Sequence, residues 1–216
     1  MLNLAFGNKT QEPLKILCLG AHCDDIEIGC GGTILKLIDT YPESVHRWVT
    51  IASTPDRALE ASASFTEFMK RVKRKQLEVK DFRDGFFPYD GAKIKDYIET
   101  LKSFFPDIIF THRLEDRHQD HRTVSELTWN TFRDHLIFEY EIPKYDGDLG
   151  QPNVFVSLDE QLCDRKIEYT LSAYKSQRQK HWFTRDTLLA LMRIRGVECA
   201  SPTNYAEAFH CRKVVL

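Results

Sequence analysis

The chain has 216 residues, of which 42% are hydrophobic and 29% charged, and its formal net charge at pH 7 is -2. This length suits a single domain over residues 1–216, and the composition is typical of a soluble globular protein. Because 30 Lys and Arg face 32 Asp and Glu, there is no global basic field, and we expect no nucleic-acid partner. No stretch approaches the roughly 18 apolar residues of a membrane span, and the N-terminus lacks a signal-peptide pattern.

The first 135 residues alternate between apolar runs and segments with helical spacing. Ser53-Thr54-Pro55-Asp56 is a helix-start signal in which Thr54 or Asp56 would be the cap. The alternation predicts an α/β fold, a Rossmann-like three-layer sandwich with a mostly parallel sheet. The predicted strands cover residues 14–20, 46–53, 75–82 and 107–112, and the predicted helices lie near 31–41, 54–72, 91–105 and 121–135.

The pattern changes after residue 136. Two further strands are predicted at 136–142 and 152–158, then helices near 159–176 and 184–195, and a last strand near 208–215. There is no internal repeat or clear linker. The six cysteines form no C-x-x-C pair, which favours free thiols in a cytoplasmic protein over a disulfide framework. Apolar helix surface is sufficient for a homo-oligomer, although no heptad seam is present.

Polar clusters follow two of the predicted strands. The carboxyl ends of parallel strands meet at one edge of a sheet, where ligands bind in open α/β folds. We therefore expect the two clusters to meet there and to form a metal site. The first cluster is His22, Asp24 and Asp25, and the second is His112, Asp116, His118, Asp120 and His121.

Each cluster alone has a simpler interpretation. Asp24 or Asp25 would cap the next helix, as Asp residues often do, and a lone histidine is usually packed or exposed. The two clusters together favour a metal, because two His and one carboxylate leave a coordination position open, which is the catalytic pattern for zinc. The remaining acids and imidazoles would supply a base for water and a donor to an oxyanion.

Gly29, Gly31 and Gly32 suggest a second kind of site, since a glycine-rich turn at a helix N-terminus can bind a pyrophosphate. The G-C-G-G spacing differs from G-x-G-x-x-G, and an acidic pair precedes it. We therefore expect these glycines to permit close packing beside the site.

These motifs resemble those of a known family. AHCDDIEIGCGGT is similar to the A-H-P-D-D-x-x-x-G-x-G-G-T motif of the PIG-L/LmbE-like N-deacetylases, and RHQDH to their H-x-D-H motif. STPDRALEAS, YKSQ and RGVECASPTNYAEAF resemble further family segments, so the likeness spans roughly residues 14–215. One departure is Cys23, where the family motif has proline; a small apolar filler is the interpretation we favour, and an oxidisable thiol is the alternative.

The resemblance implies a zinc site with one ion per chain, which other divalent metals could also occupy. The protein ligands would be His22, Asp25 and His121. It also implies an enzyme in which Asp24 is the general base for the water that the metal activates. His118 would stabilise the tetrahedral intermediate or protonate the leaving amine.

The remaining implied roles concern orientation and substrate. Asp120 would orient a histidine, and Arg57 would bind substrate. That substrate would be a small N-acetylated amino sugar or sugar conjugate, with nucleotide-linked sugars among the options. Two alternatives stay open: a metallohydrolase acting on another amide or on a phosphoester, and a non-catalytic metal-binding member of the same fold.

The basic stretch at residues 70–76 is better explained as a solvated helix end than as a nucleic-acid patch. Four aromatic side chains lie in the loops at 82–91 and 140–153, namely Phe86, Phe87, Tyr89 and Tyr145. They could stack on a sugar, although core packing is the simpler role for Phe86 and Phe87.

Overall fold

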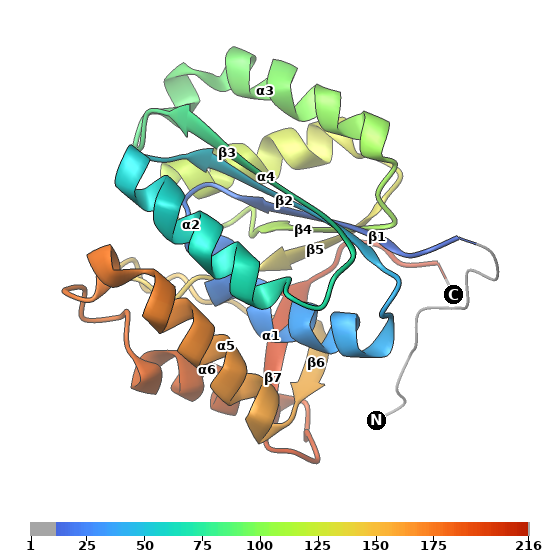
Figure 1. Cartoon of the computed structure of the whole chain (residues 1–216), viewed down its shortest axis with the longest axis vertical. Helices are drawn as coiled ribbons and strands as arrows, with labels where there is room; N and C mark the ends of the chain where they lie inside the picture. The colour runs from blue at the N-terminus through green and yellow to red at the C-terminus, as the bar shows by residue number, and fades with distance from the viewer. Residues whose placement is uncertain (1–11, 216) are drawn as a thin grey trace.

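Strand β1 (Lys15–Gly20) lies inside a seven-stranded sheet with the order β3-β2-β1-β4-β5-β7-β6 (Figure 1). The computed structural model describes residues 12–215. The first five strands in that order are parallel, while β7 runs antiparallel to both of its neighbours. The other strands are β2 (Val45–Ala52), β3 (Arg74–Phe82), β4 (Ile108–His112), β5 (Leu136–Tyr140), β6 (Val154–Leu158) and β7 (Tyr205–His210).

Helices cover both faces of the sheet, which confirms the predicted three-layer α/β fold. Figure 1 shows α3 and α4 on one face and α1, α2, α5 and α6 on the other. The helices are α1 (Asp25–Thr40), α2 (Pro55–Phe68), α3 (Gly91–Thr100), α4 (Gln119–Thr131), α5 (Glu160–Ala173) and α6 (Arg185–Glu198).

The side chains of β1 divide between two cores, because successive strand residues point to opposite faces. Leu17 and Leu19 pack in the core beneath α3 and α4, and Ile16 and Cys18 pack in the core shared with the other helices. All four are fully buried. This explains why the strand reads as a continuous apolar run, as expected for a central parallel strand.

Several element boundaries differ from the prediction. Helix α1 begins at Asp25, six residues before the predicted start at Gly31, and its whole N-terminal half is buried. Polar and glycine residues in that half therefore concealed the helical period. Thr54 is the cap of α2, since its side chain accepts the N–H of Arg57, and strand β7 begins at Tyr205 rather than near 208.

The glycines of α1 allow large groups to approach the helix. A Cβ atom at Gly29 would lie 2.2 Å from the ring of Tyr140, and one at Gly32 would lie 2.5 Å from Leu158. These glycines therefore serve close packing. The same glycine-rich part of the helix is contacted by Glu207 of β7, which accepts the N–H groups of Gly32 and Thr33 at 2.9 and 2.6 Å.

Lys166 of α5 completes this contact. Its Nζ donates to the carbonyl of Ile28 at 2.7 Å and to Glu207 at 2.6 Å. Both charged side chains are buried. A buried charge requires a partner and hydrogen bonds. Lys166 and Glu207 pair with each other, and both also hydrogen-bond to backbone groups of α1.

Gly29→Ala should destabilise the protein by about 2 kcal/mol, because overpacking a rigid core typically costs 1–3 kcal/mol. Alanine favours a helix over glycine by about 1 kcal/mol, but this gain is smaller than the expected clash with Tyr140. Denaturant unfolding measures the difference. Gly91→Ala is the control, since a Cβ there meets nothing within 4 Å; equal stabilities of the two variants would contradict the packing explanation.

Candidate active site

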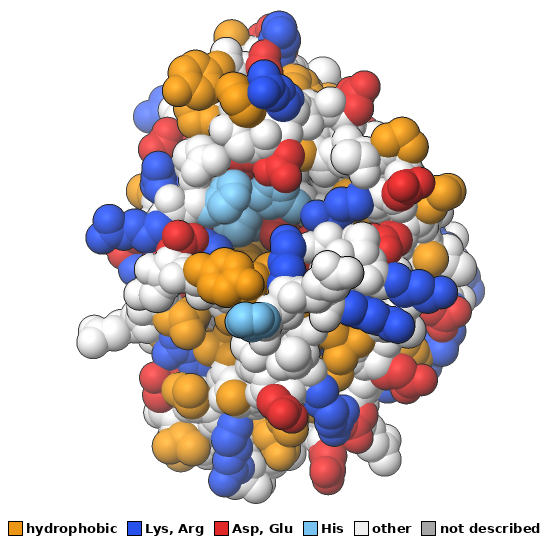
Figure 2. Space-filling view, turned by 90° about the vertical axis from the view of Figure 1, so that its left-hand side faces the viewer, with side chains coloured by type: hydrophobic (Ala, Val, Ile, Leu, Met, Phe, Trp, Pro, Cys, Tyr) orange, Lys and Arg blue, Asp and Glu red, His pale blue; other side chains and the backbone are white. Residues whose placement is uncertain are grey.

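The two predicted polar loops meet at one edge of the sheet. Strands β1 and β4 are parallel neighbours, with Ile16 opposite Ile108 and Cys18 opposite Phe110. Their carboxyl ends therefore lie side by side, although the loops are about 90 residues apart in sequence. Figure 2 shows histidine side chains gathered on this face, with acidic and basic side chains around them.

Three side chains proposed as metal ligands converge. His22 Nδ1 lies 3.2 Å from His121 Nε2 and 3.4 Å from Asp25 Oδ2. His121 Nε2 lies 3.6 Å from Asp25 Oδ1. Asp25 and His121 are each 3% exposed, so the cluster is shielded from bulk water on most sides.

The protons on the two rings can be placed from their other contacts. His121 Nδ1 faces Asp116 Oδ2 at 2.9 Å and so donates to that carboxylate. His22 Nε2 faces Asp84 at 3.1 Å and Asp120 at 3.4 Å, so it is the donor nitrogen of that ring. In neutral rings, a lone pair on His22 and one on His121 then point at each other beside Asp25. This donor set fits a divalent cation.

The titration of these groups follows the same geometry. Burial lowers the pKa of His22, but the charge of Asp25 and hydrogen bonds to nearby carboxylates outweigh it, and the pKa is raised well above its ordinary value. Burial alone would raise the pKa of Asp25, but the charges of His121, His112 and His22 hold it well below its usual range. A metal would therefore displace a proton when it binds.

His118 is oriented by the start of helix α4. Its Nδ1 accepts the backbone N–H of Asp120 at 3.2 Å. The neutral ring therefore carries its proton on Nε2. Burial, together with the charges of His121 and His22, lowers the pKa of His118. A neutral ring with Nε2–H is suited to donating a hydrogen bond to an oxyanion.

Asp24 lies immediately before α1 but does not cap it, because its side chain makes no hydrogen bond to the helix N–H groups. Its Oδ1 instead accepts from Arg57 Nη2 at 2.5 Å. Among residues 12–215, Asp24 Oδ2 and Arg57 Nε are buried without a hydrogen-bond partner. The family resemblance implies a substrate-binding role for Arg57, which stays a prediction; the structure places its guanidinium against the predicted base.

Asp120 connects three parts of the site. Its carboxylate accepts the N–H groups of Gly85 at 2.6 Å and Phe87 at 3.2 Å, and it lies 3.4 Å from His22 Nε2. The loop after β3 therefore reaches the site. It contributes Asp84, whose contact with His22 sequence reasoning missed because the residue stands in an ordinary Asp-Gly turn.

His112, the last residue of β4, belongs to the second polar cluster, and the sequence predicts no individual role for it. Its Nε2 lies 3.1 Å from Asp25 Oδ2, and its ring stacks on that of His121 with centroids 3.9 Å apart. Asp25, His112 and His121 also group as candidate metal ligands. His112 is fully buried, so it supports the site from the core side.

The cysteines and the loop aromatics lie in different surroundings. Cys23 Sγ points to the carbonyl of Ala52 at 3.7 Å, and burial raises the pKa of its thiol to about 11, as suits a packed filler. All six cysteines are free. Phe87 is fully buried, whereas Tyr89 and Tyr145 are 83% and 72% exposed.

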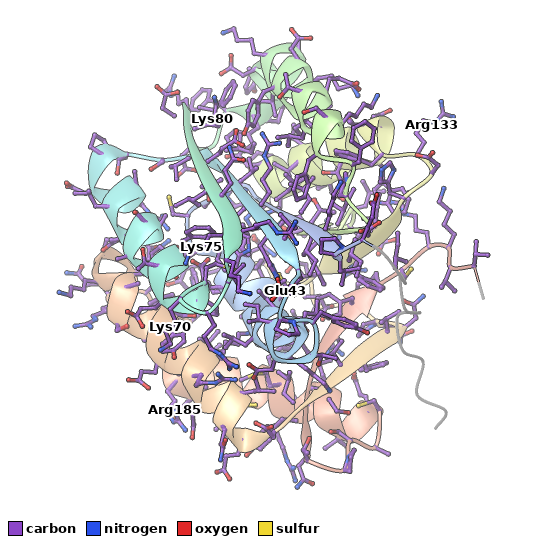
Figure 3. All side chains as sticks on the ribbon, turned by 45° about the vertical axis from the view of Figure 1, so that its right-hand side comes forward. Glu43, Lys70, Lys75, Lys80, Arg133 and Arg185 are labelled. Carbon is purple, nitrogen blue, oxygen red and sulfur yellow. The ribbon has the colours of Figure 1, made fainter. Side chains whose placement is uncertain are left out.

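The basic stretch at 70–76 covers the turn between α2 and β3 and the first residues of β3; Lys70 and Lys75 are labelled in Figure 3. Most of its charges have partners: Lys73 pairs with Glu43 at 2.7 Å, and Lys70 Nζ lies 2.7 Å from the hydroxyl of Tyr169. No helix among residues 12–215 is long and apolar enough to cross a membrane.

A buried carboxyl group lies behind the AHCDD loop. Glu27 Oε1 lies 2.5 Å from Ser64 Oγ and 2.7 Å from the hydroxyl of Tyr174, which also contacts the carbonyl of Cys23. Tyrosine has a single hydroxyl proton, and the carbonyl can only accept. Glu27 is thus placed to supply the second proton, and burial raises its pKa to about 7.

Glu27→Gln should therefore make stability less sensitive to pH between about 4.5 and 7, the ordinary and the folded pKa of Glu27. The folded pKa of about 7 lies above the ordinary 4.5, so the contribution of neutral Glu27 is present below pH 4.5 and is lost as pH rises through 7. The full difference corresponds to roughly 3 kcal/mol. Denaturant unfolding at several pH values tests this, and parallel curves for the two proteins would contradict it.

The fold and the site define an α/β sandwich with a histidine–carboxylate cluster at the carboxyl ends of its parallel strands. The chain belongs to the GlcNAc-PI de-N-acetylase (PIG-L) family, whose model matches residues 17–132. This confirms the resemblance drawn from the two motifs.

Individual relatives agree with this assignment. A diacetylchitobiose deacetylase of Thermococcus kodakarensis is 29% identical in an alignment of 135 positions that covers 55% of this chain and 51% of that protein. The chain thus spans about half the length of this curated relative. The crystal structure of N,N'-diacetylchitobiose deacetylase from Pyrococcus horikoshii aligns with a TM-score of 0.69 and 22% identity over 94% of this chain and 85% of its own.

The same fold also carries other chemistry. A 4-carboxy-2-hydroxymuconate hydratase from Pseudomonas putida aligns with a TM-score of 0.76 at 15% identity, covering 94% of this chain and 98% of its own. Fold likeness alone therefore does not define the reaction, and the function must be argued from the site.

Proposed function

We propose that this single-domain protein is a metal-dependent N-deacetylase that removes the acetyl group from an amino sugar or a sugar conjugate. The observation that carries the proposal is the convergence of His22 Nδ1, His121 Nε2 and the Asp25 carboxylate within 3.6 Å of one another. Family membership and the relatives named as diacetylchitobiose deacetylases support an N-acetylated sugar as the substrate class.

His22, Asp25 and His121 would hold one divalent cation per chain, with zinc the best match to two imidazoles and a carboxylate. When bound, such an ion acidifies an attacking water and polarises the amide carbonyl. Asp24 would take the proton of that water, and His118 Nε2–H would donate to the oxygen that becomes negative. Asp120 would keep the His22 ring in its orientation, and Arg57 would contact the substrate while it orients Asp24.

Acetate release tests the proposal directly. Zinc-loaded protein is incubated with N-acetylated monosaccharides, sugar nucleotides and glycosides, and metal content is measured on the same sample. One zinc per chain with acetate released from at least one sugar is the expected result. Two metals about 4 Å apart would indicate phosphoester chemistry instead. A protein that carries one zinc but releases no acetate from the whole panel would contradict the proposal.

A further inference from the structure

Lys144 is a lysine with a buried side chain that is not among the proposed ligands or catalytic residues. Only 8% of its side chain is exposed, and its Nζ lies 3.0 Å from Asp116 Oδ2 and 2.6 Å from Asp148 Oδ2. It belongs to the loop between β5 and β6, whose next residue, Tyr145, is 72% exposed. Lysine is almost never buried unless it is paired, so these two carboxylates hold its ammonium group inside the protein.

Asp116 leads from this lysine to the candidate metal centre. The oxygen that faces Lys144 also accepts from His121 Nδ1 at 2.9 Å, and the other oxygen accepts the backbone N–H of His118 at 2.8 Å. One carboxylate therefore fixes the ring of a proposed ligand and the backbone of the proposed oxyanion donor. Asp116 is 3% exposed, so water does little to replace either contact.

The charge on Asp116 needs a permanent partner. His121 can offer the Nε2 lone pair to a metal only as a neutral ring. A neutral imidazole donates a hydrogen bond but does not balance a buried negative charge. Among the ion pairs of the described residues, Lys144 is the lysine or arginine that contacts this carboxylate.

Asp148 extends the same connection. It shares the Lys144 ammonium and also accepts the backbone N–H of Arg117 at 2.7 Å. The loop after β5 and the loop after β4 are thus joined through one cation and two carboxylates. A movement of the first loop would be transmitted to Asp116 and through it to His121.

We propose that Lys144 is a positioning residue of the metal centre, acting through Asp116 to hold His121 and His118 in place. The inference rests on the proposed function, because it assumes that His121 is a ligand. It makes the loop after β5 part of the metal centre's support, although none of its residues is itself among the proposed ligands.

Zinc affinity, measured by competition with a chelator, tests the inference without an activity assay. Lys144→Met should weaken zinc binding about 10- to 100-fold, as loss of a group that orients a ligand typically does, and should change the visible spectrum of the cobalt-loaded protein. Lys144→Arg should restore most of the affinity. If Lys144→Met does not fold, Lys144→Gln provides the same comparison.

Arg195→Met is the matched control. Arg195 is another buried cation that holds the same loop, through Glu141 at 2.7 Å and the carbonyl of Gly150 at 3.1 Å, but its contacts do not include Asp116. It should lose stability while its zinc affinity and cobalt spectrum stay unchanged. Equal losses of zinc affinity in the two variants would mean that any damage to the loop has this effect, and would overturn the inference.

Asp116→Asn defines the route. If Lys144 acts through Asp116, the double variant Lys144→Met/Asp116→Asn should bind zinc no more weakly than Asp116→Asn alone. Fully additive losses of zinc affinity would overturn that route. Wild-type zinc binding retained in Lys144→Met would overturn the inference while the proposed function stands. A wild-type protein that binds no metal would overturn both.

Discussion

Asp24→Asn is expected to slow acetate release by roughly 100- to 10,000-fold, the range that general acid–base catalysis typically contributes, while one metal per chain is retained. Asparagine keeps the shape of the side chain but cannot accept a proton from water. Asp24 is not among the converging ligand atoms, so metal binding should survive. Acetate release at saturating substrate, with metal content determined on the same sample, measures both effects.

The substitution also removes the negative charge that pairs with Arg57, whose Nη2 lies 2.5 Å from Asp24 Oδ1. Thermal unfolding of the variant is therefore needed beside the assay. Asp56→Asn removes an acid from the exposed first turn of α2 and should leave the rate unchanged. A folded Asp24→Asn protein with near-normal turnover would show that another group is the base.

His121→Ala is expected to abolish stoichiometric metal binding and, with it, acetate release. The substitution removes one of three converging donor atoms and leaves Asp116 without its hydrogen-bonded ring. Zinc at 100 times its dissociation constant stabilises a folded protein by about 2.7 kcal/mol. Added zinc should therefore raise the unfolding temperature of the wild type and leave that of His121→Ala unchanged.

His135→Ala controls for the loss of an imidazole. His135 pairs with the exposed Asp134, away from the cluster, and its removal should not alter metal content. If His121→Ala keeps one zinc per chain after dialysis, a different set of residues holds the metal. Among the candidate groups of the described residues, His22, Asp84 and Asp120 form the one that lacks His121, so His22→Ala should then abolish metal binding.

The order of elements and the edge that carries the site were predictable from the sequence, because each depends on local pattern. Short apolar runs identified the central strands, and the carboxyl ends of β1 and β4 followed from the topology rule for parallel sheets. The N-terminal half of α1 was missed. Glu27 and three glycines interrupt its apolar spacing, and their reason lies in distant residues such as Tyr140 and Glu207.

The parts of the site that were not predicted depend on contacts between distant segments. Asp84 and Lys144 are polar residues in loops, and nothing near them in sequence separates them from solvent-exposed neighbours. Their roles follow from the 3.1 Å contact with His22 and the 3.0 Å contact with Asp116. Residues of this kind become visible only when the fold brings the loops after β3 and β5 to the edge between β1 and β4.

The hydrogen bonds of the Lys166 and Glu207 side chains to the backbone of α1 limit where the chain can be divided. The family match ends at residue 132, yet backbone N–H groups of the helix that starts at Asp25 donate to Glu207 of β7, and one of its carbonyls accepts from Lys166 of α5. A fragment that stops at residue 132 would leave those groups of α1 exposed to water or unpaired. During synthesis, these backbone groups of α1 therefore meet their partners only after α5 and β7 have been made.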